Sequence, residues 1–153
     1  MRVSSKVDYA VRAAVELATA EPGVHVKAEA IASAQDIPRK FLDNILQTLR
    51  QAGLVESRRG PDGGHSLGRP ATEITIADII RAVDGPLVGV NGRPPEAVDY
   101  AGVASPLRET WIAARAGLRS VLEAVTLADV VERHLPGVVD ELTSAPDAWK
   151  RRR

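Results

Sequence analysis

The chain has 153 residues, of which 44% are hydrophobic but only 3% aromatic, and its 20 Lys or Arg residues balance its 20 Asp or Glu residues. It has no cysteine, which excludes disulfides, thiolate metal sites and a cysteine nucleophile. This length suits a small domain with an oligomerisation arm, and a core of Ala, Val, Leu and Ile predicts a mainly α-helical protein. No apolar run could cross a bilayer and no signal-peptide pattern is present, so we expect a cytoplasmic protein with no membrane partner.

Residues 4–20 alternate apolar and charged side chains with the spacing of an amphipathic helix, which Ser4 or Ser5 can cap. Near its start, Ser5, Lys6 and Tyr9 are either phosphate contacts or ordinary surface groups, and the sequence favours neither. The short run 24–26 could add an edge strand to a later hairpin.

Two helices with a tight connection follow, at residues 28–34 and 38–52, and this spacing is typical of a helix-turn-helix. Pro38 suits the first turn of the second helix, and Gly53 can end it in a left-handed conformation. Its apolar stripe is predicted to be buried and consists of Phe41, Leu42, Ile45, Leu46 and Leu49. Its polar face carries Arg39, Lys40, Asp43, Asn44 and Gln47.

Residues 55–69 predict a β-hairpin, because two short extended runs flank the turn Gly-Pro-Asp-Gly-Gly at 60–64. We expect Arg58, Arg59 and His65 at its tip. A helical hairpin beside a solvated loop is the alternative interpretation. Two observations favour a winged helix that binds duplex DNA. The elements follow in the order of that fold, and residues 38–69 of this neutral chain carry six Lys or Arg against three Asp or Glu.

The predicted DNA-binding domain therefore spans residues 1–83. Its candidate DNA contacts are Ser5, Lys6, Tyr9, Lys27, Pro38, Arg39, Lys40, Asp43, Asn44, Gln47, Arg58, Arg59, Gly63, Gly64 and His65.

Two helix starts in the second half, at Thr75 and Thr126, each place an Asp three residues after a capping Thr. Between them lies a Gly- and Pro-rich loop at 84–105, whose length favours a functional or mobile segment. Residues 106–135 are predicted to hold a long helix, from 106 to 125, and a shorter one after it. The apolar stripe of the long helix predicts a homodimer contact through Leu107, Trp111, Ala114, Leu118, Val121, Leu122 and Val125.

Residues 136–153 are predicted to form a polar tail with a basic end, either disordered or in weak contact with phosphates. The three histidines, His25, His65 and His134, lack metal-ligand spacing, and no catalytic constellation is visible. We therefore expect no enzyme activity, no metal and no cofactor.

Several stretches resemble the Rrf-two family of winged-helix regulators, to which IscR and CymR belong, and the similarity covers about residues 1–135. The matching stretches are MRVSSK at 1–6, YAV at 9–11, LRQAGLV at 49–55, RGPDGGHSL at 59–67 and VDG at 83–85. The resemblance implies a homodimeric transcription factor, with the second helix of the helix-turn-helix in the major groove and the wing in the minor groove. It places Arg39, Lys40 and Asp43 at the exposed start of that helix and Arg59 on the wing. His65 stands where the family usually has Tyr.

Cluster-binding members of the family carry three cysteines in the loop, whereas residues 91–105 here offer none. Ser105 lies close to the last of those cysteine positions, and Arg108 lies close to the histidine ligand of IscR. Serine is a poor iron-sulfur ligand and arginine is none, so the resemblance implies a member without the cluster.

We thus predict a homodimeric winged-helix repressor of a palindromic operator. The rival interpretations are a protein-interaction module that regulates a partner enzyme through the same scaffold, and a small-molecule enzyme. An unknown small-molecule or protein effector would act at loop 84–105 where it meets the first helix near Asp8 and Arg12, unless the loop is only a spacer.

Overall fold

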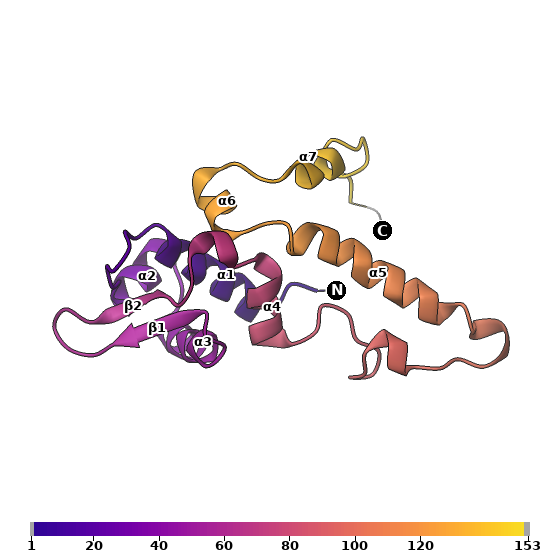
Figure 1. Cartoon of the computed structure of the whole chain (residues 1–153), viewed down its shortest axis with the longest axis horizontal. Helices are drawn as coiled ribbons and strands as arrows, with labels where there is room; N and C mark the ends of the chain where they lie inside the picture. Colours follow the sequence, from indigo (N-terminus) through magenta and orange to yellow (C-terminus); the bar gives the residue numbers. More distant parts are fainter. Residues whose placement is uncertain (1, 152–153) are drawn as a thin grey trace.

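The computed structural model describes residues 2–151 and is mainly α-helical with one small sheet (Figure 1). The helices are α1 Ser5–Ala18, α2 Ala28–Gln35, α3 Arg39–Gln51, α4 Ile76–Asp84, α5 Leu107–Leu122, α6 Leu127–Glu132 and α7 Gly137–Thr143. Short 3-10 turns lie at η1 Ala71–Glu73, η2 Pro95–Ala97 and η3 Gly102–Ala104. The strands β1 Val55–Arg58 and β2 Gly64–Leu67 pair antiparallel. No helix within 2–151 combines the length and the apolar character needed to cross a bilayer.

Helix α1 lies at the centre of the fold, in contact with α2, α3, α4 and α6. Its face toward them carries Ala10, Ala13 and Ala14, all buried, and these small side chains let several helix backbones approach closely. The surrounding core is aliphatic, as predicted from the composition. Ser4 caps α1 by accepting a hydrogen bond from the Val7 N–H, as its sequence position suggested.

Helix α3 buries Leu42, Ile45, Leu46 and Leu49 as predicted, but the expectation for Phe41 is wrong, because its side chain is 57% exposed. Phe41 lies at the edge of the apolar stripe, where α1 covers it only in part. Its ring meets that of Tyr9, with 6.3 Å between the centroids.

The wing is a tightly paired hairpin that is also tied to the start of α2. Val26 and His65 exchange two backbone hydrogen bonds of 2.8 Å each, so the expected edge strand is a single bridge. Close packing of backbone atoms requires glycine at two positions of the wing. A Cβ at Gly63 would lie 2.1 Å from the Arg58 carbonyl oxygen, and a Cβ at Gly64 would lie 2.6 Å from the Val26 carbonyl oxygen.

Both predicted capping boxes are present, at Thr75 with Asp78 and at Thr126 with Asp129. The two cap segments also pair with each other: the Ile76 N–H donates to the Val125 carbonyl at 3.0 Å, and the Leu127 N–H donates to that of Ile74 at 2.9 Å. Leu127 is fully buried in the α1 core. The chain therefore returns to the winged helix directly after α5.

This return corrects one residue of the predicted dimer face. Helix α5 ends at Leu122 rather than at residue 125, and Val125 is buried in the core of its own protomer. Leu122 also packs in part against the cluster around Ala77 and Ile80. Of the remaining stripe residues, Leu107, Trp111 and Ala114 are exposed and Leu118 and Val121 are half-buried. Helix α5 has no buried residue and runs away from the winged helix (Figure 1).

Two more expectations need correction. Residues 136–153 are not simply a polar tail, because α7 forms there and contacts α5, while Arg152 and Arg153 lie outside the described residues. The loop does not reach Arg12, whose guanidinium instead donates to the Gln35 carbonyl of α2. It meets α1 at its first turn, where Leu87 packs against Val7 and the Ser4 hydroxyl donates to Asp84.

The wing packing predicts that Gly63→Ala lowers the free energy of unfolding by about 1–3 kcal/mol, because the hairpin must open to accept the methyl group. The measurement is urea unfolding followed by circular dichroism. Gly89→Ala is the matched control, since a Cβ there meets nothing closer than 3.6 Å. Equal stability of the two variants would contradict this explanation of the wing glycines.

Candidate nucleic-acid interface

One face of the molecule brings together most of the residues predicted to contact DNA. Lys40, Asp43, Asn44 and Gln47 are exposed along α3, as the polar face of the predicted helix requires. A groove of about 690 Å³ separates this helix from the start of α1. It is lined by Ser5, Lys6, Tyr9, Phe41, Asn44, Ile45, Gln47, Thr48 and Gln51. The start of α1 and the polar face of α3 thus form a single surface.

Arg39 does not point freely outward, because its guanidinium lies between two carboxylates. Its Nε donates to Asp43 at 2.9 Å, and its Nη1 donates to Glu29 of α2 at 2.5 Å. The hydrogen bond from Arg39 lowers the pKa of Glu29, and the same bond is the main cause of the raised pKa of Arg39. All three side chains are exposed, so their pairing is weak and can be broken by a stronger anion. Lys40 has no ion-pair partner within residues 2–151.

The wing presents two arginines at its tip. Arg58 ends β1, Arg59 begins the turn, and both are exposed. The turn is closed by the Gly63 N–H, which donates to the Gly60 carbonyl at 3.0 Å. Lys27 supports this turn from α2, since its Nζ donates to the same Gly60 oxygen at 3.0 Å. Lys27, predicted as a DNA contact, therefore braces the wing tip within the protomer.

His65 does not lie at the tip, as the sequence suggested, but inside the sheet. Its backbone pairs with Val26, and its Nδ1 lies 2.8 Å from the Ser57 hydroxyl on β1. Burial lowers the pKa of the imidazole, so this ring is mostly neutral near pH 7. Gly63 and Gly64, named among the candidate DNA contacts, are likewise explained by packing inside the hairpin.

Sequence reasoning missed three residues of this surface: Phe41, Arg12 and Glu29. The Arg12 guanidinium lies 5.0 Å from the centroid of the Tyr9 ring, and Tyr9 in turn meets Phe41. These contacts hold the Tyr9 ring of α1 against Phe41 of α3. The position of Phe41 at the rim of the α3 stripe was a sequence signal. Arg12 was expected to meet loop 84–105 rather than Tyr9, and nothing in the sequence pointed to Glu29.

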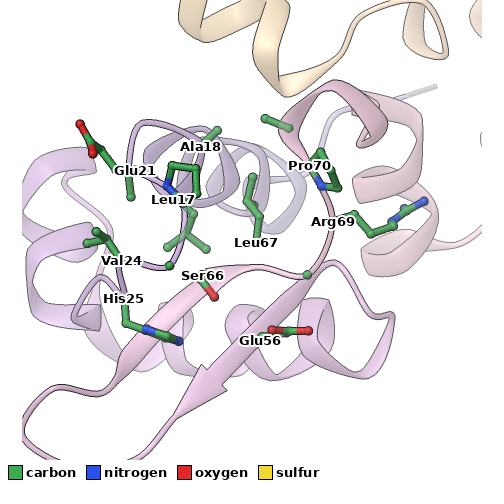
Figure 2. A pocket seen from close by; sticks show the side chains of 15 residues that line it. Leu17, Ala18, Glu21, Val24, His25, Glu56, Ser66, Leu67, Arg69 and Pro70 are labelled. Atoms are coloured by element: carbon green, nitrogen blue, oxygen red, sulfur yellow. The ribbon is translucent and has the colours of Figure 1, made fainter.

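A second cavity, of about 670 Å³, lies between the end of α1 and the wing strands (Figure 2). Leu17 and Leu67 line it together with charged side chains of both signs, including Glu56 and Arg69. None of the residues predicted to contact DNA lines it. The candidate interface is therefore distinct from this cavity.

The donor set of the loop does not fit an iron-sulfur cluster. Cysteine is absent from the chain, and no group of three or more His, Asp or Glu residues in the described part could hold a metal ion. Arg108, near the expected ligand position, donates instead to the Glu96 carbonyl at 3.0 Å. The residues of this loop therefore do not supply the thiolate ligands that such a cluster needs.

Comparison with known proteins identifies the family. Residues 3–133 match the model of the Rrf2 family, described as "Iron-dependent Transcriptional regulator". The chain is 50% identical over 142 residues to a Mycobacterium tuberculosis protein named as an HTH-type transcriptional regulator, Rv1287, covering 93% of this chain and 88% of that protein. It is 34% identical to the HTH-type transcriptional regulator CymR of Bacillus subtilis over 130 residues, 85% of this chain and 89% of CymR.

Solved structures agree with this assignment. The structure of B. subtilis CymR, described as the global cysteine regulator of that organism, superimposes with a TM-score of 0.71 at 31% identity, covering 87% of this chain and 98% of CymR. The IscR of T. potens gives a TM-score of 0.69 at 31% identity, covering 87% and 88% of the two chains. Together, these matches and the winged helix described above show that the chain belongs to the Rrf2 (Rrf-two) family of DNA-binding transcriptional regulators.

Proposed function

We propose that the chain is a cytoplasmic, homodimeric repressor that binds a palindromic operator without a cysteine-ligated cluster. The observation that carries this proposal is the single surface formed by the polar face of α3 and the start of α1, together with two exposed arginines on the wing. Binding and release of DNA require no chemical step, in keeping with the lack of a recognisable catalytic constellation in the sequence.

Helix α3 is the element suited to the major groove. Asn44 and Gln47 can each pair with a base edge, and Asp43 can accept from cytosine. Arg39 can exchange its partners on binding. A DNA phosphate can replace Glu29 and Asp43 as the anion that the Arg39 guanidinium binds, and Asp43 is then free to meet a base. In this arrangement Lys40 and Lys6 approach the phosphates on the two sides of the helix.

The wing arginines are suited to the minor groove. Arg59 begins a turn that Lys27 holds in place, so its guanidinium is carried on a rigid support. A narrow A/T-rich minor groove has an enhanced negative potential and attracts such a side chain. Arg58 at the end of β1 would then contact the adjoining backbone.

Helix α5 supports the homodimer. A helix of 16 residues with no buried side chain, carrying Trp111 and Leu107 on its surface at 37% and 39% exposure, lacks a sufficient partner within its own protomer. A second copy of α5 packed along Leu107, Trp111, Ala114, Leu118 and Val121 would cover this stripe. Two winged helices related by a two-fold axis match a palindromic operator.

The wing assignment predicts that Arg59→Ala weakens binding to a selected palindrome by about 1–3 kcal/mol, because a guanidinium leaves the minor groove. Lys150→Ala is the control: it removes one positive charge from the C-terminal segment, where Lys150 pairs with Asp147. The measurement is titration of a labelled duplex at two salt concentrations. If Arg59→Ala binds as tightly as the unaltered protein, the wing does not read DNA.

The dimer assignment predicts that Leu118→Glu gives a monomer with little operator affinity, since a buried unpaired carboxylate costs several kcal/mol. Leu122 is left intact because it contributes to the protomer core. Ala116→Glu places the same charge on the opposite, exposed side of α5 and should remain dimeric. Sedimentation equilibrium distinguishes these outcomes, and a dimeric Leu118→Glu would rule out α5 as the dimer contact.

A further inference from the structure

A cavity of about 330 Å³ lies where α4, the start of the loop and α5 meet. Its apolar walls come from the loop and consist of Pro86, Leu87, Val88 and Pro94. Three arginines complete it: Arg81 from the last turn of α4, and Arg115 and Arg119 from α5. This size lies at the lower end of the range that small metabolites occupy.

The charges around the cavity do not balance. Every charged residue of the lining is an arginine. Two carboxylates reach these arginines from outside the lining: Glu96 pairs with Arg115 at 2.7 Å, and one oxygen of Glu123 is shared between Arg81 and Arg119. The three arginines therefore pair with only two carboxylates. Arg119 makes the weakest of these ion pairs, with 3.7 Å between its Nε and Oε1 of Glu123.

Burial makes this surplus more significant than it would be on an open surface. The Arg115 side chain is only 17% exposed, whereas Arg81 and Arg119, at the mouth of the cavity, are 36% and 48% exposed. Guanidinium groups that are partly shielded from water favour an anion that can accept two parallel hydrogen bonds, and a carboxylate has two oxygens placed to do so. A phosphate monoester carries nearly two charges and would exceed the surplus of one.

We propose that this cavity binds a small organic monocarboxylate. Its carboxylate approaches Arg81 and Arg119 from within the cavity, whereas Glu123 reaches them from outside the lining, and it supplies the missing negative charge. Its short apolar portion packs on Leu87, Val88 and Pro94.

The position of the cavity gives such a ligand a regulatory role, and this second step rests on the function proposed above. Arg81 belongs to α4, which packs on α1 and α3, whereas Arg119 belongs to α5, which is held to the winged helix by few side chains. A carboxylate clamped by both would fix the angle of α5 to the winged helix. Because α5 is the proposed dimer contact, that angle sets the separation of the two recognition helices.

The first test is calorimetric titration of the intact protein with sodium hexanoate at constant ionic strength. Saturable binding is expected, weaker for acetate because it lacks the apolar portion, and absent for hexylammonium. Arg119→Gln should weaken hexanoate binding by at least about tenfold. Arg133→Gln is the matched control, because it removes the same charge from an exposed position outside the cavity lining, and it should bind as the unaltered protein does.

A lack of saturable hexanoate binding, or equal binding by Arg119→Gln and Arg133→Gln, would overturn the proposed site. This titration contains no DNA, so its outcome is independent of the function proposed above. Operator affinity measured with and without saturating hexanoate then tests the regulatory step. An unchanged affinity would refute regulation while leaving the binding site established.

Discussion

Close packing against the alanine face of α1 is the constraint on which the rest of the structure depends. Ala10, Ala13 and Ala14 leave no room for larger side chains, and four helices meet along this one element. A chain with one Phe, two Trp and two Tyr cannot fill gaps between distant helices, so it brings the helix backbones together instead. The position of α3 relative to the start of α1, and hence the groove between them, follows from this packing.

The same packing divides the molecule into two parts: the winged helix, which packs around α1, and helix α5, which has few contacts with it. The paired cap segments at Thr75 and Thr126 bring Leu127 back into the α1 core, so α5 is attached to the winged helix near its C-terminal end. Farther from that end, α5 is contacted by Glu96, which pairs with Arg115, by Tyr100, which accepts a hydrogen bond from Trp111, and by α7. An arm attached in this way can transmit a small change at its base into a larger displacement along its length, which is the geometry that the carboxylate site would use.

Local sequence patterns predicted the elements well where a single segment contains the determining interactions. The capping boxes need only a Thr and the Asp three residues later, and the buried stripe of α3 needs only helical spacing. The hairpin followed from its turn residues, although the close contacts that require Gly63 and Gly64 arise only when β1, β2 and Val26 meet.

The details that sequence analysis could not supply all depend on neighbours that are distant in the chain. Arg39 is engaged by Glu29 from the preceding helix, His65 is enclosed by Ser57 and Val26, and Val125 is buried by the return to α1. Phe41 was assigned to the core by periodicity alone, whereas the extent of α1 decides how much of its ring is covered. Helical spacing fixes the direction of a side chain but not the partner that it meets.

The central claim is that two copies of one surface, made of α3, the start of α1 and the wing, read the operator together. Hydroxyl-radical footprinting of the intact protein on a selected duplex tests this claim most directly. The account predicts two protected segments related by a two-fold axis, separated by about one helical turn of roughly 10 base pairs or a multiple of it. A single protected segment, or protection that is the same on unrelated duplexes, would contradict it.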